Sequence, residues 1–172
     1  MKKKMTIAEL NAADEATFVE RLGDIFEDSP WIAAAAWARR PFADRDALHR
    51  AMTAIVDEAP RERQVALIAA HPDLVGEAAR EGRLSAASRD EQASAGLDRL
   101  EPSEIEEFAV LNAAYRERFR FPFVICVREN RKAAIVAGMR ARLNNERDAE
   151  IAAALREIGA IARLRLAAAV AP

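Results

Sequence analysis

Residues 44–58 read DRDALHRAMTAIVDE, and the spacing of their apolar side chains decides the fold class. Leu48, Met52 and Ile55 recur three and four residues apart, which places them on one face of an α helix. The segment 18–26 repeats this spacing, and alanine, leucine, arginine and glutamate dominate the composition. The sequence therefore predicts an all-α protein that forms a single compact multi-helix bundle.

Helix start signals divide the rest of the chain into further helical segments. Thr6, Ser88 and Ser103 are each followed three residues later by a glutamate, the pattern of a capping box. Pro30 and Pro102 are placed as prolines of a first helical turn. The predicted helices span residues 12–26, 30–38, 44–58, 61–70, 73–81, 88–97, 103–118, 131–142 and 146–169.

One stretch departs from the helical pattern. Residues 121–127 read FPFVICV, an aromatic and β-branched run opened by a proline, which predicts a short extended and buried segment. Its backbone N–H and C=O groups need partners, because such groups are costly to bury without a hydrogen bond. A ligand rich in amide groups could supply those partners. A short hairpin, or a connector satisfied by side chains, is the alternative that the residues alone favour.

Length and charge limit the class of protein. The chain has 172 residues and no visible linker or repeat, so we expect one domain over residues 1–172. Its 26 basic and 28 acidic residues give a net charge of −2, which does not attract nucleic acid or anionic lipid. Arg156 and Arg163 interrupt the apolar C-terminal stretch and argue against a membrane-spanning helix. The basic start, Met1 to Lys4, is not followed by the apolar run of a signal peptide.

Cysteine, histidine and glycine usage argues against a metal or a cofactor. Cys126 is the only cysteine, so no intrachain disulfide can form, and we expect a buried thiol in a cytoplasmic protein. His49 and His71 are the only histidines, and their spacing matches no metal-binding motif. The 6 glycines are scattered singly and form no phosphate-binding loop. We therefore expect the protein to act on a small molecule without a metal ion or a cofactor.

A polar cluster can be read around His71. Pro72 disfavours helical backbone at the residue before it, so His71 should lie where the helix over 61–70 ends and could point into a cleft. Glu91 and Gln92 follow twenty positions later. Each residue also has a structural interpretation that the sequence alone favours. The imidazole could interact with helix-end carbonyls, and Glu91 could close a capping box with Ser88.

The stretch from His71 to Arg128 resembles the 2-oxo-4-hydroxy-4-carboxy-5-ureidoimidazoline (OHCU) decarboxylases of urate catabolism. The segments 22–31, 40–42 and 161–166 match the pattern of that family as well, so the likeness covers nearly the whole chain. Small departures lie at Asp28 and Glu77, outside the catalytic pattern. The resemblance implies decarboxylation to S-allantoin without a cofactor, by a homodimer.

The resemblance also implies a set of site residues. The predicted catalytic residues are His71, Glu91 and Arg165, and the predicted substrate-binding residues are Pro72, Ser88, Gln92, Phe123, Val124 and Ile125. Arg163 and Arg165 are two positions apart on a helix, so one can face the interior while the other is solvated. The family places the ligand-side arginine at Arg165. A surface arginine is the interpretation that the sequence alone favours. Asp73 is expected to cap the next helix.

Two other functions stay open on the sequence. A catalytically silent helical interaction module of the same fold would be expected to lack one of His71, Glu91 and Arg165, and all three are present. The second open function is that of a lyase or hydrolase acting on a related ureido compound. Pocket detail, and not the fold, decides the substrate.

Overall fold

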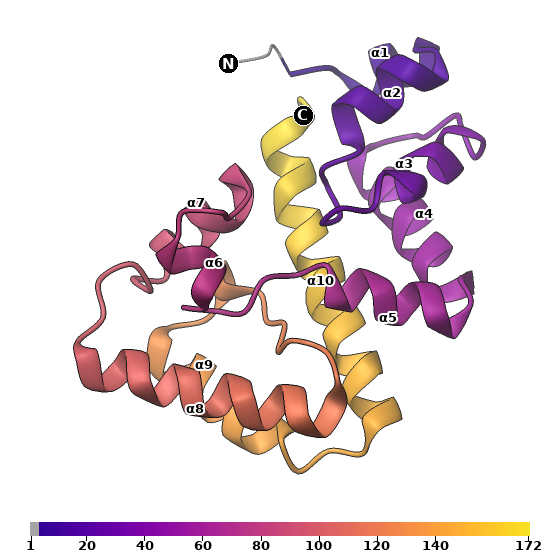
Figure 1. The fold of residues 1–172 in the computed structure, drawn as a ribbon. Helices are drawn as coiled ribbons and strands as arrows, with labels where there is room; N and C mark the ends of the chain where they lie inside the picture. The colour runs from indigo at the N-terminus through magenta and orange to yellow at the C-terminus, as the bar shows by residue number, and fades with distance from the viewer. Residues whose placement is uncertain (1–3) are drawn as a thin grey trace. The chain divides into compact units, whose positions relative to one another are not determined.

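The computed structural model describes residues 4–172, which form ten α helices and one 3-10 helix (Figure 1). The all-α prediction is confirmed. The chain forms two compact units, the first from the residues up to Ala70 together with Gly159–Pro172, and the second from His71–Ile158. No helix within residues 4–172 has both the length and the apolar composition needed to cross a bilayer.

Both units are helical, and the long helix α10 contributes to each. The first unit contains α1 (Ile7–Ala12), α2 (Glu15–Leu22), α3 (Pro30–Trp37), α4 (Arg45–Glu58), α5 (Arg61–Ala69) and the C-terminal part of α10 (Arg147–Ala169). The second contains α6 (Glu77–Arg80), α7 (Ala86–Ser94), α8 (Pro102–Phe119), the 3-10 helix η1 (Val127–Glu129), α9 (Lys132–Arg142) and the N-terminal part of α10.

The first two helices confirm one start signal and correct one boundary. Thr6 and Glu9 form the predicted capping box, in which the Glu9 N–H donates to Thr6 Oγ1 at 3.2 Å and the Thr6 N–H donates to Glu9 Oε2 at 2.7 Å. The helix predicted over 12–26 is present but shorter, and spans Glu15–Leu22. Asp14 accepts the N–H of Thr17 at 2.8 Å and so begins a separate helix, α2.

The core of the first unit is built on the apolar faces that the spacing predicted. Leu48 and Met52 on α4 are fully buried, as is Phe18 on α2. Helix α3 packs against both α2 and α4. On the same helix α4, His49 Nε2 lies 2.8 Å from the carbonyl oxygen of Gly159, so this histidine has a structural contact.

Aromatic side chains from α8 and the residues after it form much of the core of the second unit. The ring centroid of Tyr115 lies 4.6 Å from that of Phe119 and 5.4 Å from that of Phe123. Helix α8 ends at Phe119 because Arg120 adopts the left-handed conformation, with φ of 65°. The chain then turns into the segment 121–127.

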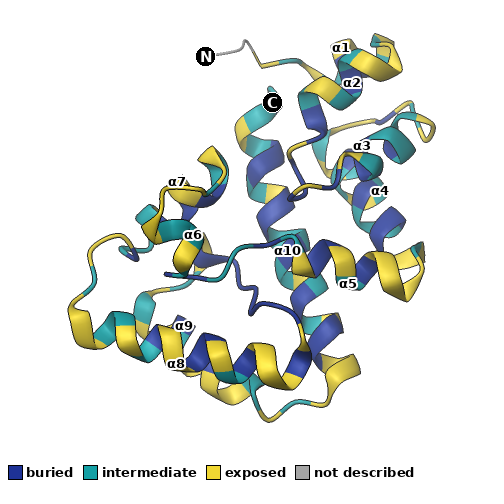
Figure 2. Cartoon of the chain, in the orientation of Figure 1, coloured by how far each residue is buried: buried dark blue, intermediate teal, exposed yellow. Residues whose placement is uncertain are grey.

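Residues 121–127 form the predicted buried segment, with one change at its end. Every residue in it is buried, and residues 122–126 belong to neither a helix nor a strand (Figure 2). Val127 already begins η1. In the described part of the chain there is no strand, and an isolated bridge pairs Met5 with Val170.

Candidate active site

His71 lies where the sequence predicted, directly after a helix end. Helix α5 stops at Ala69 with Ala70 as its C-cap, and the residue after the cap is His71. The side chain is buried, with 7 % of the residue exposed. A buried imidazole is held in a defined position, which a group that transfers protons requires.

Three side chains from other helices hold the loop that follows His71. The Val75 N–H donates to Gln92 Oε1 at 3.1 Å, and Asn112 Nδ2 donates to the Leu74 carbonyl at 2.8 Å. The third contact is an ion pair in which Arg116 Nε donates to both carboxylate oxygens of Asp73, at 2.8 and 2.9 Å. The loop is thereby fixed to α7 and α8.

The predicted role of Asp73 as a helix cap is wrong. Its carboxylate binds Arg116, and Gly76 is the N-cap of α6. The predicted helix over 73–81 is accordingly shorter, because Val75 adopts the left-handed conformation with φ of 54° and helical backbone cannot pass through it.

Helix α7 presents a buried polar face. Its N-cap is Ser85, whose Oγ accepts the Ser88 N–H at 3.2 Å, so the predicted capping box of Ser88 and Glu91 is wrong. Ser88, Glu91 and Gln92 are three and four positions apart and share one side of the helix, and each is less than a tenth exposed. Helix α7 packs against η1. Burial of three polar side chains on one face is costly unless they serve one another or a ligand.

The second unit contains both groups of residues that the family resemblance implies for the pocket wall, those on α7 and those in the segment 121–127. Gln92 joins the loop after His71 to the helix face that carries Glu91. Cys126, at the end of the extended segment, is buried, and burial raises the pKa of its thiol to about 11, with smaller contributions from Glu129, Glu157 and Glu91. Of these three carboxylates, Glu91 is the one that belongs to the predicted site, and Cys126 directly follows the predicted residues Phe123–Ile125.

Side chains satisfy part of the backbone of that segment. Arg142 Nη1 donates to the Val124 carbonyl at 2.8 Å, and the Cys126 N–H donates to Glu157 Oε2 at 2.8 Å. Asn130 Nδ2 donates to the Cys126 carbonyl at 2.9 Å. For Val124 and Cys126, these contacts support the alternative in which the segment is a connector whose backbone groups bond to side chains.

Arg165 lies on the part of α10 that belongs to the first unit. It is buried, and its Nη1 lies 2.9 Å from Glu27 Oε2 and 3.4 Å from the Asp24 carbonyl. Arg163 is exposed, so the expected contrast between the two arginines is confirmed and the interpretation of Arg165 as a surface residue is wrong. Sequence reasoning gave no role to Glu27, although it lies within the 22–31 match. That Arg165 joins His71 and Glu91 in one site stays a prediction.

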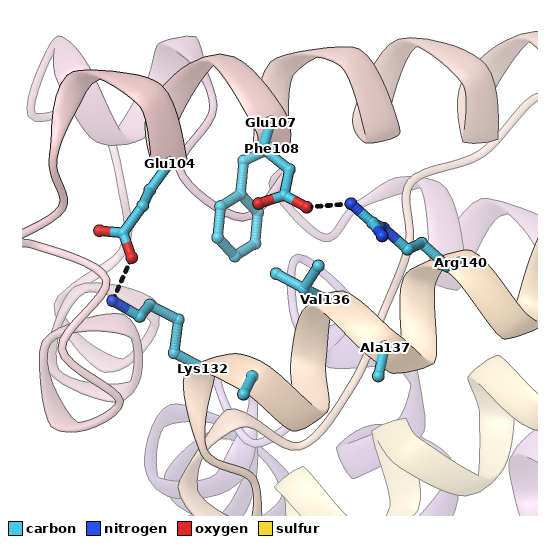
Figure 3. Close-up of a pocket in the computed structure, with 8 residues that line it drawn as sticks. Glu104, Glu107, Phe108, Lys132, Val136, Ala137 and Arg140 are labelled. Carbon is cyan, nitrogen blue, oxygen red and sulfur yellow. Dashed lines mark hydrogen bonds and ion pairs between the residues drawn. The ribbon is translucent and has the colours of Figure 1, made fainter.

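A groove in another part of the second unit holds none of the predicted site residues. It has a volume of about 390 Å³ and lies between α8 and α9 (Figure 3). Apolar side chains such as Phe108 and Val136 line it, and its charged residues form the ion pairs Lys132 with Glu104 and Arg140 with Glu107. Residues 4–172 contain no group of three or more histidine, cysteine or acidic side chains placed to bind a metal.

Comparison with known proteins decides the family. The family model described as OHCU decarboxylase matches residues 11–167. The chain belongs to the OHCU decarboxylase family. The matched region contains all nine predicted site residues, from His71 to Arg165.

Individual members of the OHCU decarboxylase family are similar along most of the chain. The 2-oxo-4-hydroxy-4-carboxy-5-ureidoimidazoline decarboxylase of Haloferax volcanii is 44% identical, over 95% of this chain and 95% of the relative. The enzyme of the same name from Halalkalicoccus jeotgali is 42% identical, over 95% of this chain and 90% of the relative. A crystal structure of (S)-allantoin synthase is similar with a TM-score of 0.75 at 28% identity, over 96% of this chain and 54% of the other.

Proposed function

We propose that this chain catalyses the cofactor-independent decarboxylation of OHCU to (S)-allantoin in urate catabolism. The observation that carries the proposal is the match to the OHCU decarboxylase family over residues 11–167. The second unit supports it with a buried polar face on α7, joined through Gln92 to the loop that starts at His71. As a member of this family, the chain is a carboxy-lyase.

The substrate explains why no cofactor is needed. Its carboxylate is attached to a ring carbon that also bears a hydroxyl and lies next to a ring C=N bond. When the bond to the carboxylate breaks and CO2 leaves, its electron pair forms a C=C bond and the imine nitrogen takes up a proton. The resulting enol becomes allantoin when the hydroxyl loses its proton and the neighbouring carbon gains one. An enzyme adds control over the face on which that carbon is protonated.

We assign the roles by chemistry. His71 acts as general base or hydrogen-bond partner at the hydroxyl, because an imidazole exchanges protons near neutral pH. Glu91 orients the ring and ureido N–H groups, and its charge disfavours the bound carboxylate more than the transition state, in which that charge is being lost. Arg165 holds a carboxylate or carbonyl oxygen with paired donors.

The substrate-binding residues complete this proposed pocket. Ser88 and Gln92 supply polar groups from the buried face of α7, and Pro72 together with the backbone of Phe123–Ile125 shapes the opposite wall. Gln92 already accepts the Val75 N–H through Oε1, so its amide NH2 is the end that would donate to a carbonyl of the substrate.

The proposal includes a homodimer in the cytoplasm that acts as one domain over residues 1–172. The lone, buried Cys126 is consistent with a reducing compartment. Light scattering on the purified chain should give twice the mass of 18.9 kDa. A monomer mass would remove the dimer from the proposal and leave the reaction untouched.

The reaction is tested with a short-lived substrate made in the cuvette. Urate oxidase and the hydrolase that opens its product generate OHCU from urate, and circular dichroism follows the formation of optically active allantoin. We expect (S)-allantoin to appear faster than in a matched sample without the chain. Racemic allantoin formed at the spontaneous rate would reject the proposed function.

A further inference from the structure

We propose that Arg142 and Glu150 are positioning residues for the decarboxylation, because they fix the backbone of the segment Phe123–Ile125 against which the substrate binds. This inference rests on the proposed function, which places that segment in the pocket wall. Neither residue belongs to the predicted site, and both lie in the second unit with the segment that they hold.

Arg142 contacts the segment in two ways from the last turn of α9. Its Nη1 donates to the Val124 carbonyl at 2.8 Å, and its guanidinium carbon lies 4.3 Å from the centroid of the Phe123 ring. The planar guanidinium therefore sets both the direction of one carbonyl and the position of the neighbouring ring. Its Nε donates to Glu150 Oε1 at 2.7 Å.

Glu150 is a fully buried carboxylate that fixes the guanidinium in turn. Besides Arg142, it accepts hydrogen bonds from Asn145 Nδ2 at 2.8 Å and from the hydroxyl of Tyr115. Burial and the hydrogen bond to Glu150 raise the pKa of Tyr115, which keeps the phenol protonated as a donor. With three donors, the carboxylate has one geometry available to it.

Stability alone does not account for this arrangement. Apolar side chains of similar volume would fill the same space at equal or lower cost, because a buried ion pair loses in desolvation much of what it gains in attraction. The polar network differs from apolar packing in that it holds one backbone carbonyl in a fixed direction. Glu157 holds the Cys126 N–H on the other side of Ile125, so the segment is held at both ends.

The inference is tested by replacing the guanidinium and measuring steady-state kinetics with OHCU generated in place. Arg142→Gln removes the charge, and Arg142→Lys keeps it but replaces the planar guanidinium by a single ammonium nitrogen, which lacks the rigid fork of donors and the flat face over Phe123. We expect both variants to raise KM at least about tenfold with kcat within about threefold, because a misplaced binding surface weakens ground-state and transition-state binding alike. Hydrogen exchange of the amides in 123–126 should become faster in both.

Arg140→Gln is the matched control. Arg140 lies on the same helix, but its side chain is 65 % exposed and donates to Glu107 instead of to the segment. Its KM should stay within about twofold of the unmodified chain, since exposed ion pairs contribute little.

A third variant keeps the test decisive if the Arg142 variants do not fold. Tyr115→Phe retains the aromatic packing and removes only the hydroxyl that donates to Glu150, and it should raise KM about threefold. An unchanged KM in every variant that shows a native helical spectrum overturns the inference. If the unmodified chain itself fails to accelerate the reaction, the proposed function fails instead, before any variant is compared.

Discussion

The two histidines of the chain have different surroundings. His49 Nε2 is 2.8 Å from a backbone carbonyl of α10, whereas His71 follows the end of α5 and leads into a loop held by Gln92 and Asn112. The contact with the Gly159 carbonyl accounts for His49 as a structural residue. The second arrangement ties the loop that follows His71 to α7, the helix with the buried polar face, which suits a residue that acts on a ligand.

This difference predicts opposite results for two substitutions. His71→Ala should lower kcat/KM for OHCU by about 10²- to 10⁴-fold, the usual contribution of a general base, with an unchanged far-UV spectrum. His49→Gln should keep full activity, because the glutamine amide can still donate to the Gly159 carbonyl. Loss of helical signal in His71→Ala would instead assign that residue a structural role.

Cys126 predicts a stability change at alkaline pH. Its pKa is raised from 9.0 to about 11, chiefly by burial. Above pH 9 the unfolded chain loses the thiol proton while the folded chain keeps it, so the unfolding free energy should fall as the pH rises from 9 to 11. Chemical denaturation of the chain and of Cys126→Ala, compared at pH 8 and pH 11, measures this contribution. An equal fall in both would show that other groups cause it.

At the scale of single elements, α7 separates a capping serine from a serine of the proposed pocket. Ser85→Ala removes the N-cap and should lower the unfolding free energy by about 1 kcal/mol with no effect on KM. Ser88→Ala leaves the cap in place and should raise KM about tenfold with a smaller loss of stability. The two variants, compared by urea denaturation and kinetics, are each other's control. A larger loss of stability in Ser88→Ala than in Ser85→Ala, with KM raised only in Ser85→Ala, would show that Ser88 is the cap.

The helix starts show what sequence spacing can and cannot decide. The Thr6 box was predicted correctly because nothing nearby competes with it. Ser85 and Ser88 are both acceptable caps for the same helix, and tertiary burial of Glu91 decided between them. The capping box predicted at Ser103 is wrong, because Glu101 and Glu104 form the box, whereas Pro102 lies in the first turn of α8 as predicted.

The placement of single residues was predictable where the signal is local and unpredictable where it depends on distant contacts. Pro72 indicated that His71 follows the helix end, and spacing indicated that Arg163 and Arg165 face different directions, while the family resemblance chose Arg165 as the inner one. No local pattern indicates that Glu27 pairs with Arg165 across a wide gap in sequence. The same holds for Arg142, whose contact with Val124 is formed only once α9 packs in the second unit.

At the scale of the whole molecule, α10 supplies residues to both compact units. Gly159 lies within this continuous helix, where the chain passes from the second unit to the first, and it has room for a methyl group, since an added Cβ would lie 3.5 Å from Thr53 Cγ2. Gly159→Ala should therefore raise the unfolding free energy by about 0.5–1 kcal/mol, because alanine restricts the unfolded chain and favours helix. Thermal or urea unfolding measures the change.

Gly96→Ala is the matched control for this prediction. Gly96 has φ of +74°, a conformation that costs alanine about 1 kcal/mol, although the space around its Cβ position is open. The same substitution should thus stabilise at one glycine and destabilise at the other. A loss of stability in Gly159→Ala would show that α10 cannot accept even a methyl group at this position.

The single buried thiol also has a practical consequence. Because the sequence contains no other cysteine and Cys126 is 1 % exposed with a high pKa, maleimide reagents at neutral pH find no native target on the folded surface. A cysteine introduced at Val110, which is 63 % exposed, would carry a fluorophore or spin label selectively. The working enzyme can then be labelled at a chosen position without first removing its native cysteine.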